Sequence, residues 1–351
     1  MNPIPETLLG LVQHYSPTGQ EAAAVNWLVQ RMSYLGFNRA FVDQAGNAVG
    51  IKGNGSNQIV LLGHIDTVPG EIPLRAEEGV FHGRGTVDAK GPLAAFVDAL
   101  AGSSVHPDWQ VVVIGAVDEE GDSRGARYLV DQYQPHFAII GEPSQWNRVT
   151  LGYKGSQHAR LSVRLPLVHS SQGGSAGDVL LAAWQTLLLK VREYNTGKSM
   201  FDQLLPTVLS MRSSNDAYAT HAQLQVGVRL PVEVSPQGWV EEWLATLDGV
   251  TVEPSLGGIS AYKADKNSGL SRAFLGAIRA ASGTPGFVSK SGTADINLVA
   301  PAWGCPAVAY GPGDSNLDHT PHEHISLEDF SRAVQVLQGV LQRLGAANPA
   351  E

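Results

Sequence analysis

The chain has 351 residues, which exceeds the usual size of a single hydrophobic core, so two domains are the default expectation. A hydrophobic content of 43%, a charged content of 16% and a mean hydropathy of -0.06 argue against a disordered chain. The formal net charge of -9 argues against nonspecific binding to nucleic acid or to an anionic membrane.

Cys305 is the only cysteine in the sequence, which excludes an intrachain disulfide and a thiolate-rich zinc cluster. Any metal must therefore be held by nitrogen and oxygen ligands. Residues 1–10 lack a basic segment followed by an apolar one, and no apolar run approaches the roughly 18 residues of a spanning helix. We therefore expect a cytoplasmic protein.

The first part of the chain alternates helical and strand patterns. Apolar residues recur at helical spacing from Ala24 to Leu35, Gly36 ends the pattern, and residues 18–21 have the form of a capping box. Apolar runs then predict strands at 59–62, 110–117 and 137–140, with helices at 91–101 and 123–132 between them. This alternation predicts an α/β fold with a mainly parallel sheet, helices on both faces and an active site at the carboxyl ends of the strands.

The pattern changes over residues 152–260, where the order of elements is β-α-β-β-α-β. The predicted elements are a strand at 157–165, a helix at 176–194, strands at 207–212 and 221–230, a helix at 237–247 and a strand at 250–253. This order predicts an inserted α+β, ferredoxin-like domain. Residues 1–151 and 261–351 would form the other domain, which ends with a helix at 270–281, a strand near 306–310 and a helix at 327–344.

Segments at the ends of predicted strands carry an imidazole or carboxylates, and these are residues 63–66, 85–91, 117–121 and 141–143. A pair of divalent ions needs a bridging carboxylate and, for each ion, one imidazole and one further carboxylate, with positions left open for water. The candidates are Asp88 as bridge, His64 and Glu142 for one ion, and Glu120 and His319 for the other. The sequence therefore predicts a metal centre with two zinc-like ions.

Two further carboxylates have separate expected roles. Asp66 follows His64 by two residues on an extended chain, so it points to the same side and can accept the second N–H of the imidazole. Glu119 is next to Glu120 at a strand end, where neighbouring side chains diverge. Glu119 can therefore take a proton from metal-bound water, whose pKa falls to about 7, and return it to a leaving amine. The pattern predicts amide hydrolysis without a nucleophilic side chain.

In this order, the motifs resemble the metallopeptidase-type deacylase family that includes acetylornithine deacetylase, succinyl-diaminopimelate desuccinylase, carboxypeptidase G and aminoacylase. The resemblance rests on residues 63–69, 83–91, 118–121, 141–144 and 318–323. It implies the ligand roles given above, Glu119 as general base, and two divalent ions, zinc with cobalt as the alternative.

Two finer expectations follow from the resemblance. The family's histidine stands four residues before a glutamate, which favours His319 before Glu323 and leaves His322 as the fallback. The family likeness also implies a cis peptide bond between Asp88 and Ala89.

The resemblance also implies roles for residues outside the metal ligands. It implies that the insert pairs two subunits and that His169, within His169-Ser170-Ser171, reaches the metal site of a second subunit to stabilise the oxyanion. Arg229 matches a carboxylate-binding arginine, although Gly227 stands where the family has aspartate, so a plain salt bridge is the alternative. Gly292 and Gly311 lie in loops that resemble substrate-facing glycine loops, with tight turns as the alternative. Lys154 is a further candidate for substrate contact.

Within the family, the compact length and residues 153–156 and 311–321 resemble a subgroup that acts on an acidic amino-group carrier protein. The implied reaction hydrolyses the amide between the terminal glutamate side chain of the carrier and the α-amino group of lysine or ornithine, in lysine or arginine biosynthesis. Alternatives are acetylornithine deacetylase, another N-acyl-amino-acid deacylase, a dipeptidase or, from another class, a noncatalytic metal-binding dimer. An acidic carrier would need a basic rim, for which the candidates are Lys154, Arg160, Arg164 and Lys263.

Overall fold

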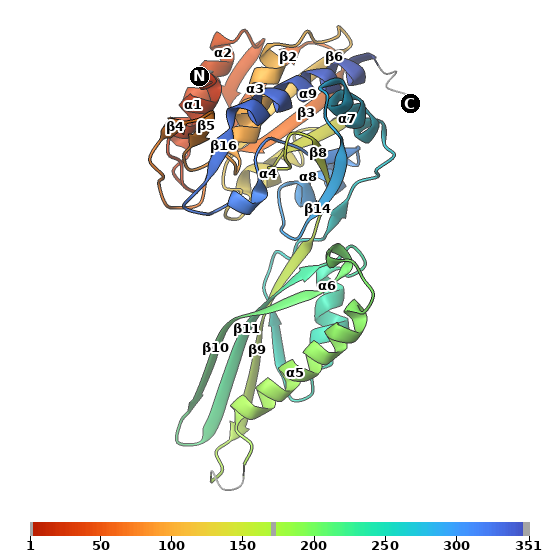
Figure 1. Cartoon of the computed structure of the whole chain (residues 1–351). Helices are drawn as coiled ribbons and strands as arrows, with labels where there is room; N and C mark the ends of the chain where they lie inside the picture. Colours follow the sequence, from red (N-terminus) through yellow and green to blue (C-terminus); the bar gives the residue numbers. More distant parts are fainter. Residues whose placement is uncertain (1–2, 170–172, 347–351) are drawn as a thin grey trace. The chain divides into compact units, whose positions relative to one another are not determined.

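The computed structural model describes residues 3–169 and 173–346, and the chain folds into two compact units (Figure 1). The first unit comprises Met1–Leu151, Ala264–Val288 and Ala294–Glu351, and the second comprises Gly152–Lys263 and Ser289–Thr293. Residues 261–263 and 289–293 thus group with the insert, whereas the sequence pattern assigned them to the discontinuous domain.

The main sheet has nine strands in the order β1-β2-β6-β3-β7-β15-β8-β13, with β14 paired to β8. It is mixed, because β6, β3, β7 and β15 are parallel while the outer strands pair antiparallel. The strands are β1 (Arg39–Val42), β2 (Ala48–Gly53), β3 (Asn57–His64), β6 (Trp109–Ala116), β7 (Phe137–Gly141), β8 (Arg148–Tyr153), β13 (Tyr262–Lys263), β14 (Gly286–Lys290) and β15 (Ala307–Ala309). A small sheet, in the order β16-β5-β4, consists of β4 (Arg75–Glu77), β5 (Val80–His82) and β16 (His324–Ser326).

The helices of the first unit form two groups. In one group α1, α2, α3, α7 and α9 pack on one another, and in the other α4 packs on α8. Their bounds are α1 (Glu6–Gln13), α2 (Ala22–Tyr34), α3 (Lys90–Ala101), α4 (Arg124–Leu129), α7 (Gly269–Ala280), α8 (Ile296–Trp303), the short η4 (Ser315–Leu317) and α9 (Leu327–Ala346). The predicted α/β class is confirmed, and the strands predicted from the buried apolar runs are β3, β6 and β7.

The second unit has the predicted β-α-β-β-α-β order. Its antiparallel sheet has the order β10-β11-β9-β12, which is the ferredoxin-like arrangement. The elements are β9 (Gly155–Pro166), α5 (Ala176–Asn195), η2 (Met200–Asp202), β10 (Leu205–Asn215), β11 (Ala219–Leu230), α6 (Pro236–Gly238), η3 (Trp239–Leu244) and β12 (Thr251–Pro254). The helix predicted at 237–247 is instead a short α-turn followed by the wider π-type turns of η3.

The two units have separate cores. Leu61, Leu93 and Phe96 belong to the first core, and Leu161, Leu224 and Trp239 to the second.

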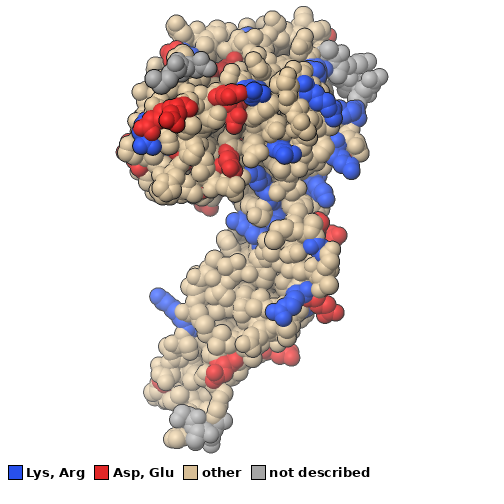
Figure 2. All heavy atoms as spheres, viewed as in Figure 1, with Lys and Arg blue, Asp and Glu red and all other residues tan. Residues whose placement is uncertain are grey.

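In the view of Figure 2, acidic side chains gather on the part of the first unit near α1, and basic ones gather near α7. Over residues 3–169 and 173–346, no helix combines the length and apolar character needed to cross a membrane.

Candidate metal centre

Neighbouring parallel strands deliver the site residues to one edge of the main sheet. His64 is the last residue of β3, Glu119 and Glu120 follow β6, and Glu142 directly follows β7. Because β6, β3 and β7 are adjacent and parallel, their carboxyl ends lie side by side. The sheet therefore places these four side chains at one point of the first unit.

A row of glycines brings Asp88 to the same edge. Gly115, Gly63 and Gly141 are aligned across β6, β3 and β7. A Cβ at Gly63 would lie 3.2 Å from Cβ of Leu93 on α3, so the glycines let this helix approach the sheet closely. Asp88 lies just before α3, and the predicted cis peptide bond to the next residue is present.

Asp88 lies between two imidazoles. Its Oδ1 is 3.2 Å from Nε2 of His64, and its Oδ2 is 2.9 Å from Nε2 of His319. Nε2 of His319 is also 3.0 Å from Oε1 of Glu120. One ligand atom from each of His64, Asp88 and Glu120 lies within 4.8 Å of the others. The two carboxylate oxygens of Asp88 thus face different imidazoles, as a bridging ligand requires.

Glu119 and Glu142 extend this acidic cluster. Oε2 of Glu119 is 4.0 Å from Nε2 of His64, and the Glu119 side chain is only 13% exposed. Glu142 is buried and interacts electrostatically with His64 and Asp88. The structure therefore brings together all six side chains that the sequence assigned to metal binding and proton transfer.

The carboxylates repel one another in this buried place. Burial raises the pKa of Glu119 well above its ordinary value, and the charges of Asp295, Glu142 and Glu120 add to the increase, while His64 opposes it. Burial is also the largest cause of the raised pKa of Glu142 and of Glu120. Carboxylates outnumber imidazoles in the cluster, an imbalance that a cation would relieve.

The imidazoles and the bridging carboxylate support one another. Burial alone would raise the pKa of Asp88, but hydrogen bonds with His319 and His64 hold it well below its ordinary value. The contact with Asp88 is in turn the main reason that the pKa of His319 is raised to about 9. Imidazole nitrogens together with carboxylate oxygens are the ligand set that zinc accepts. The side chains present therefore fit a divalent metal.

Asp66 is fully buried beside His64 and fixes several parts of the site. Its carboxylate accepts hydrogen bonds from the N–H groups of Glu119 and Glu120, both at 3.1 Å, and from the hydroxyl of Thr18 at 2.9 Å. Nδ1 of His64 is 3.0 Å from the main-chain carbonyl of Asp66 and 3.4 Å from its carboxylate. Asp66 thus orients the imidazole mainly through its backbone, and its carboxylate holds the loop after β6.

The predicted capping box at residues 18–21 does not form. Helix α2 begins after Glu21 without a side-chain cap, and Glu21 accepts a hydrogen bond from the N–H of Gly19. The hydroxyl of Thr18 is used by Asp66 instead, because a buried carboxylate requires donors.

A buried ion pair supports the loops that carry Asp88 and His319. Oε2 of Glu323 is 2.8 Å from Nη1 of Arg84, and both side chains are buried. Oε1 of Glu323 accepts hydrogen bonds from the N–H groups of Val87 and Asp88, at 2.9 and 3.0 Å. Glu323, singled out in the sequence only as a marker of the motif, is therefore a positioning residue.

The structure shows which histidine near the end of the motif reaches the metal centre. His319 has a left-handed backbone, with φ of 61°, and its ring reaches Asp88 and Glu120. His322, the fallback, lines a separate hollow with His82 and His324. The imidazole of His319 is therefore the one that the motif contributes to the cluster.

Asp295 is a carboxylate near the site that was predicted only as part of a loop. It is 2% exposed, and burial raises its pKa to about 7. A hydrogen bond with Ser123 and the charge of Arg127 oppose this increase, and Asp295 in turn raises the pKa of Glu119. The sequence did offer a signal for Asp295. It is an acidic residue between a loop of small residues and the apolar segment that forms α8.

The residues predicted to contact substrate have different environments. Lys154 is fully buried, and its ammonium donates to the main-chain carbonyls of Met200, Phe201 and Gln203. Burial lowers the pKa of Lys154 to about 8. The ammonium of Lys154 therefore has a structural role, and Lys154 is not part of the expected basic rim.

Arg229, Gly292 and Gly311 also differ in how open they are to solvent. Arg229 is exposed, and its Nη1 is 3.2 Å from Oγ1 of Thr293, next to Gly292, where an added Cβ would meet open space. Gly311 is buried, and a Cβ there would lie 2.6 Å from Pro92, so close packing explains this glycine. The structure therefore favours Arg229 and Gly292 over Gly311 as residues open to a ligand.

His169 is exposed and follows β9 in the second unit. Ser170 and Ser171 of its motif lie outside the described residues.

Comparisons with known proteins agree with this geometry. A LysW-lysine hydrolase of Deinococcus radiodurans is 43% identical over 94% of this chain and 93% of its own length. A LysW-lysine/LysW-ornithine hydrolase of Sulfurisphaera tokodaii is 29% identical over 97% of this chain and 95% of its own.

Solved structures share the fold. Aminopeptidase PepT of Bacillus cereus has a TM-score of 0.78 at 18% identity, covering 98% of this chain and 100% of its own. A metallo-carboxypeptidase of Sulfolobus solfataricus has a TM-score of 0.74 at 16% identity, covering 97% and 99%. The model of peptidase family M20/M25/M40 matches residues 60–343, and the chain therefore belongs to this family of metal-dependent hydrolases.

Proposed function

We propose that this protein hydrolyses the amide that joins lysine or ornithine to the terminal glutamate side chain of an amino-group carrier protein. The observation that carries the proposal is the cluster in which each carboxylate oxygen of Asp88 faces one imidazole, with Glu119 beside it. The names of relatives that align over nearly the whole chain support the choice of substrate.

The cluster supplies the ligands for two divalent ions, zinc with cobalt as the alternative. His64 and Glu142 would hold one ion, Glu120 and His319 the other, and Asp88 would bridge them. When bound, such ions polarise a carbonyl and make water a stronger acid. Their identity and number stay a proposal.

Glu119 is placed to move the protons of the reaction. It lies next to the ligand cluster, and its side chain is mostly shielded from solvent. A carboxylate in such a place can accept a proton from the attacking water and deliver it to the α-amino group of the leaving lysine. Asp66 holds the backbone of Glu119 through its N–H, so the base has a fixed position.

The second unit carries a surface that suits a second copy of the chain. Edge strand β10 exposes apolar side chains, and so does α5, which packs beside it; these residues are Leu181 (42% exposed), Leu189 (61%), Val208 (40%), Leu209 (56%) and Met211 (41%). An open strand edge flanked by apolar side chains is a common basis for pairing. The predicted action of His169 on the other subunit requires a homodimer, and we propose that this surface forms it. Action in the cytoplasm is proposed as well.

The test measures release of free lysine from the carrier–lysine conjugate. The metal-free protein is assayed after zinc is added and, in a separate sample, after cobalt is added. Acetylornithine and succinyl-diaminopimelate are measured beside it. The proposal requires the conjugate to have the highest kcat/KM. Fast cleavage of acetylornithine without release of lysine from the conjugate would overturn it in favour of a deacetylase.

A further inference from the structure

Within the second unit, none of the described helices packs on one face of the sheet. Apolar residues of β9 and β11, such as Leu161 and Leu224, point into the core that α5 and η3 complete. The alternate residues point to the opposite face, where Arg160, Arg164 and Gln225 are exposed. This opposite face, here called the open face, comprises the outward residues of β9, β10 and β11.

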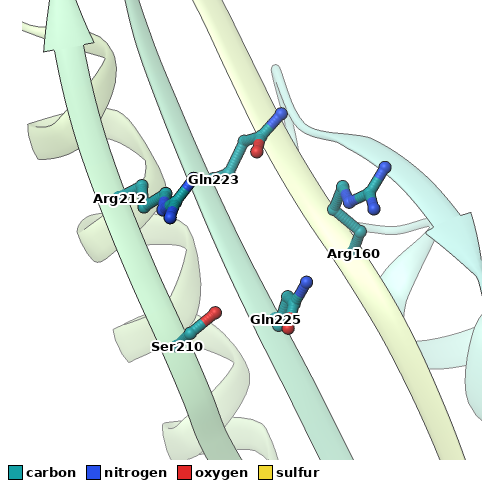
Figure 3. A pocket seen from close by; sticks show the side chains of 5 residues that line it. All are labelled: Arg160, Ser210, Arg212, Gln223 and Gln225. Atoms are coloured by element: carbon teal, nitrogen blue, oxygen red, sulfur yellow. The ribbon is translucent and has the colours of Figure 1, made fainter.

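The strand register arranges the open face as rows of hydrogen-bond donors. Each row runs across β9, β11 and β10, and the rows are Arg160-Gln225-Ser210, Ser162-Gln223-Arg212 and Arg164-His221-Ser214. Figure 3 shows that Arg160, Ser210, Arg212, Gln223 and Gln225 line a hollow on this face, which has a volume of about 390 Å³. Guanidinium and amide groups therefore surround a concave surface.

The open face is free of carboxylates along its three strands. Strands β9, β10 and β11 contain no Asp or Glu, although the whole chain has a net charge of -9. The nearby acids lie at the border, where Glu253 of β12 is 3.1 Å from Arg160 and Asp216 is 3.0 Å from His221. Arg160 and Glu253 are each about half exposed, and such a pair is weak enough to exchange partners.

We propose that the open face docks an acidic polypeptide segment in extended conformation. This inference rests on the proposed function, in which the substrate is attached to an acidic protein, and names the surface that would bind that protein. The face is proposed as a site for the carrier itself, separate from the residues that act on the amide.

The spacing of the arginines suits such a segment. Arg160 and Arg164 are four residues apart on β9, about 13 Å, and Arg212 lies two strands away, about 10 Å. Alternate residues of an extended peptide are about 7 Å apart and point to one side, so its carboxylates can reach more than one guanidinium. Arginine binds carboxylate through two parallel hydrogen bonds, and Gln223 and Gln225 can bond to peptide groups between them.

A polypeptide suits this face better than nucleic acid does. Strands β9, β10 and β11 contain no Phe, Tyr or Trp, so the face has no large aromatic ring on which bases could stack, only the imidazoles of His158 and His221.

The experiment compares two substrates in a charge-reversal variant, Arg164→Glu/Arg212→Glu. The first substrate is the carrier–lysine conjugate, and the second is the small amide γ-glutamyl-lysine, which has the same scissile bond without the carrier. The matched control, Arg192→Glu/Arg279→Glu, changes net charge equally at exposed positions of α5 and α7. Thermal melts check that each variant is folded.

The expected result is an increase in KM for the conjugate of at least about tenfold in the open-face variant, with γ-glutamyl-lysine unchanged within about twofold. The difference should shrink as salt concentration rises. The control should leave both substrates near wild type. Substitution Glu253→Gln, which frees Arg160, should lower KM for the conjugate about twofold.

Other outcomes would overturn the docking proposal. An unchanged KM for the conjugate in the folded double variant would mean that the face does not bind the carrier. An equal loss for both substrates would mean that the arginines act through the fold of the unit or through the subunit pairing proposed for β10. If the wild-type protein cleaves neither substrate, the proposed function fails; binding of fluorescently labelled carrier, measured by anisotropy, then decides the docking proposal alone, and absence of salt-sensitive binding would reject it.

Discussion

The main sheet of the first unit and the sheet of the second unit differ in where they carry charged side chains. In the first unit the central strands are buried, and their polar side chains are collected at the carboxyl ends, where Asp88, Glu119, Glu120 and Glu142 form a negative cluster. In the second unit the sheet has only one covered face, and the other carries arginines and amides spread along the strands. Buried charged side chains need partners of opposite charge or a metal ion, whereas exposed ones can be spread along a whole surface.

This difference explains why the same type of interaction has different weight in the two units. In the first unit, the Arg84–Glu323 ion pair and Gly141 support a site of fixed geometry. On the open face, the Arg160–Glu253 pair and the neighbourhood of Gly227 border solvent. Pairs of matched substitutions in the two units therefore test the comparison.

The largest effect is expected for Glu119→Gln, compared with Glu233→Gln in the second unit. Loss of the buried base should lower kcat by about 10²- to 10⁴-fold, because glutamine cannot accept the proton. Metal content, measured by mass spectrometry of the purified protein, should be retained because Glu119 is not among the proposed ligands. The exposed Glu233 should be replaceable without loss of activity. Loss of metal together with activity in Glu119→Gln would assign this residue to the ligands instead.

A smaller effect is expected when an ion pair is broken in each unit. Arg84→Met leaves the fully buried Glu323 without its guanidinium, and Arg84 also donates to the carbonyl of Thr320, at 3.1 Å. We expect a loss of about 3 kcal/mol in the free energy of unfolding and weaker metal binding, since the loops of Asp88 and His319 lose their support. Arg160→Met, which breaks the exposed pair with Glu253, should cost less than about 1 kcal/mol. Equal losses in denaturant titrations would contradict the distinction.

Glycines in the two sheets give the next comparison. A Cβ at Gly141 would lie 2.9 Å from the buried ring of Phe96 and 3.0 Å from Cα of Gly63, so Gly141→Ala should cost about 2 kcal/mol by overpacking. A Cβ at Gly227 would lie 2.8 Å from the ring of His158, which is exposed and can rotate into solvent. Gly227→Ala should therefore change stability by less than about 0.5 kcal/mol. A chemical denaturation series measures both, and a similar cost at the two sites would mean that the open face is more rigid than its exposure suggests.

The sequence predicts the fold well where one local signal dominates. Apolar runs located β3, β6 and β7, and the strand predicted at 221–230 is β11. Short strands such as β4 and β13 were not predicted, because runs of 3 and 2 residues carry too little pattern. Strand β13 also depends on pairing with β8, which is far away in the chain. The helix expected at 237–247 forms as η3 instead, with Trp239 and Trp243 buried, because the spacing of apolar residues does not distinguish α-helical from π-helical turns.

The candidate site, like the fold, could be predicted only in part. Ligand types and strand ends were enough to predict that His64, Glu120 and Glu142 lie at one edge of the sheet. Asp88 was also expected at a strand end, but it lies in the loop before α3, and the choice of His319 depended on the family resemblance. The supporting contacts could not be predicted, because Glu323 reaches Asp88 across 235 residues of sequence and Thr18 reaches Asp66 across 48. Burial of Lys154 was missed because a lysine beside a tyrosine and a glycine has the same pattern whether its ammonium meets solvent or carbonyl groups.

The last prediction concerns the dependence of stability on pH at this lysine. Burial lowers the pKa of Lys154 to about 8 in the folded chain, against 10.5 for an unburied lysine. Between these values the unfolded chain binds more protons than the folded chain, so the contribution of Lys154 to stability rises with pH. From pH 7 to pH 10 the wild-type protein should gain about 2 kcal/mol relative to Lys154→Met. Urea unfolding of both proteins at each pH measures this, with the exposed Lys266→Met as control. A constant difference across the range would mean that the carbonyl groups of Met200, Phe201 and Gln203 fully compensate the ammonium for lost water, and that a buried charge in the second unit is as well supported as the Arg84–Glu323 pair in the first.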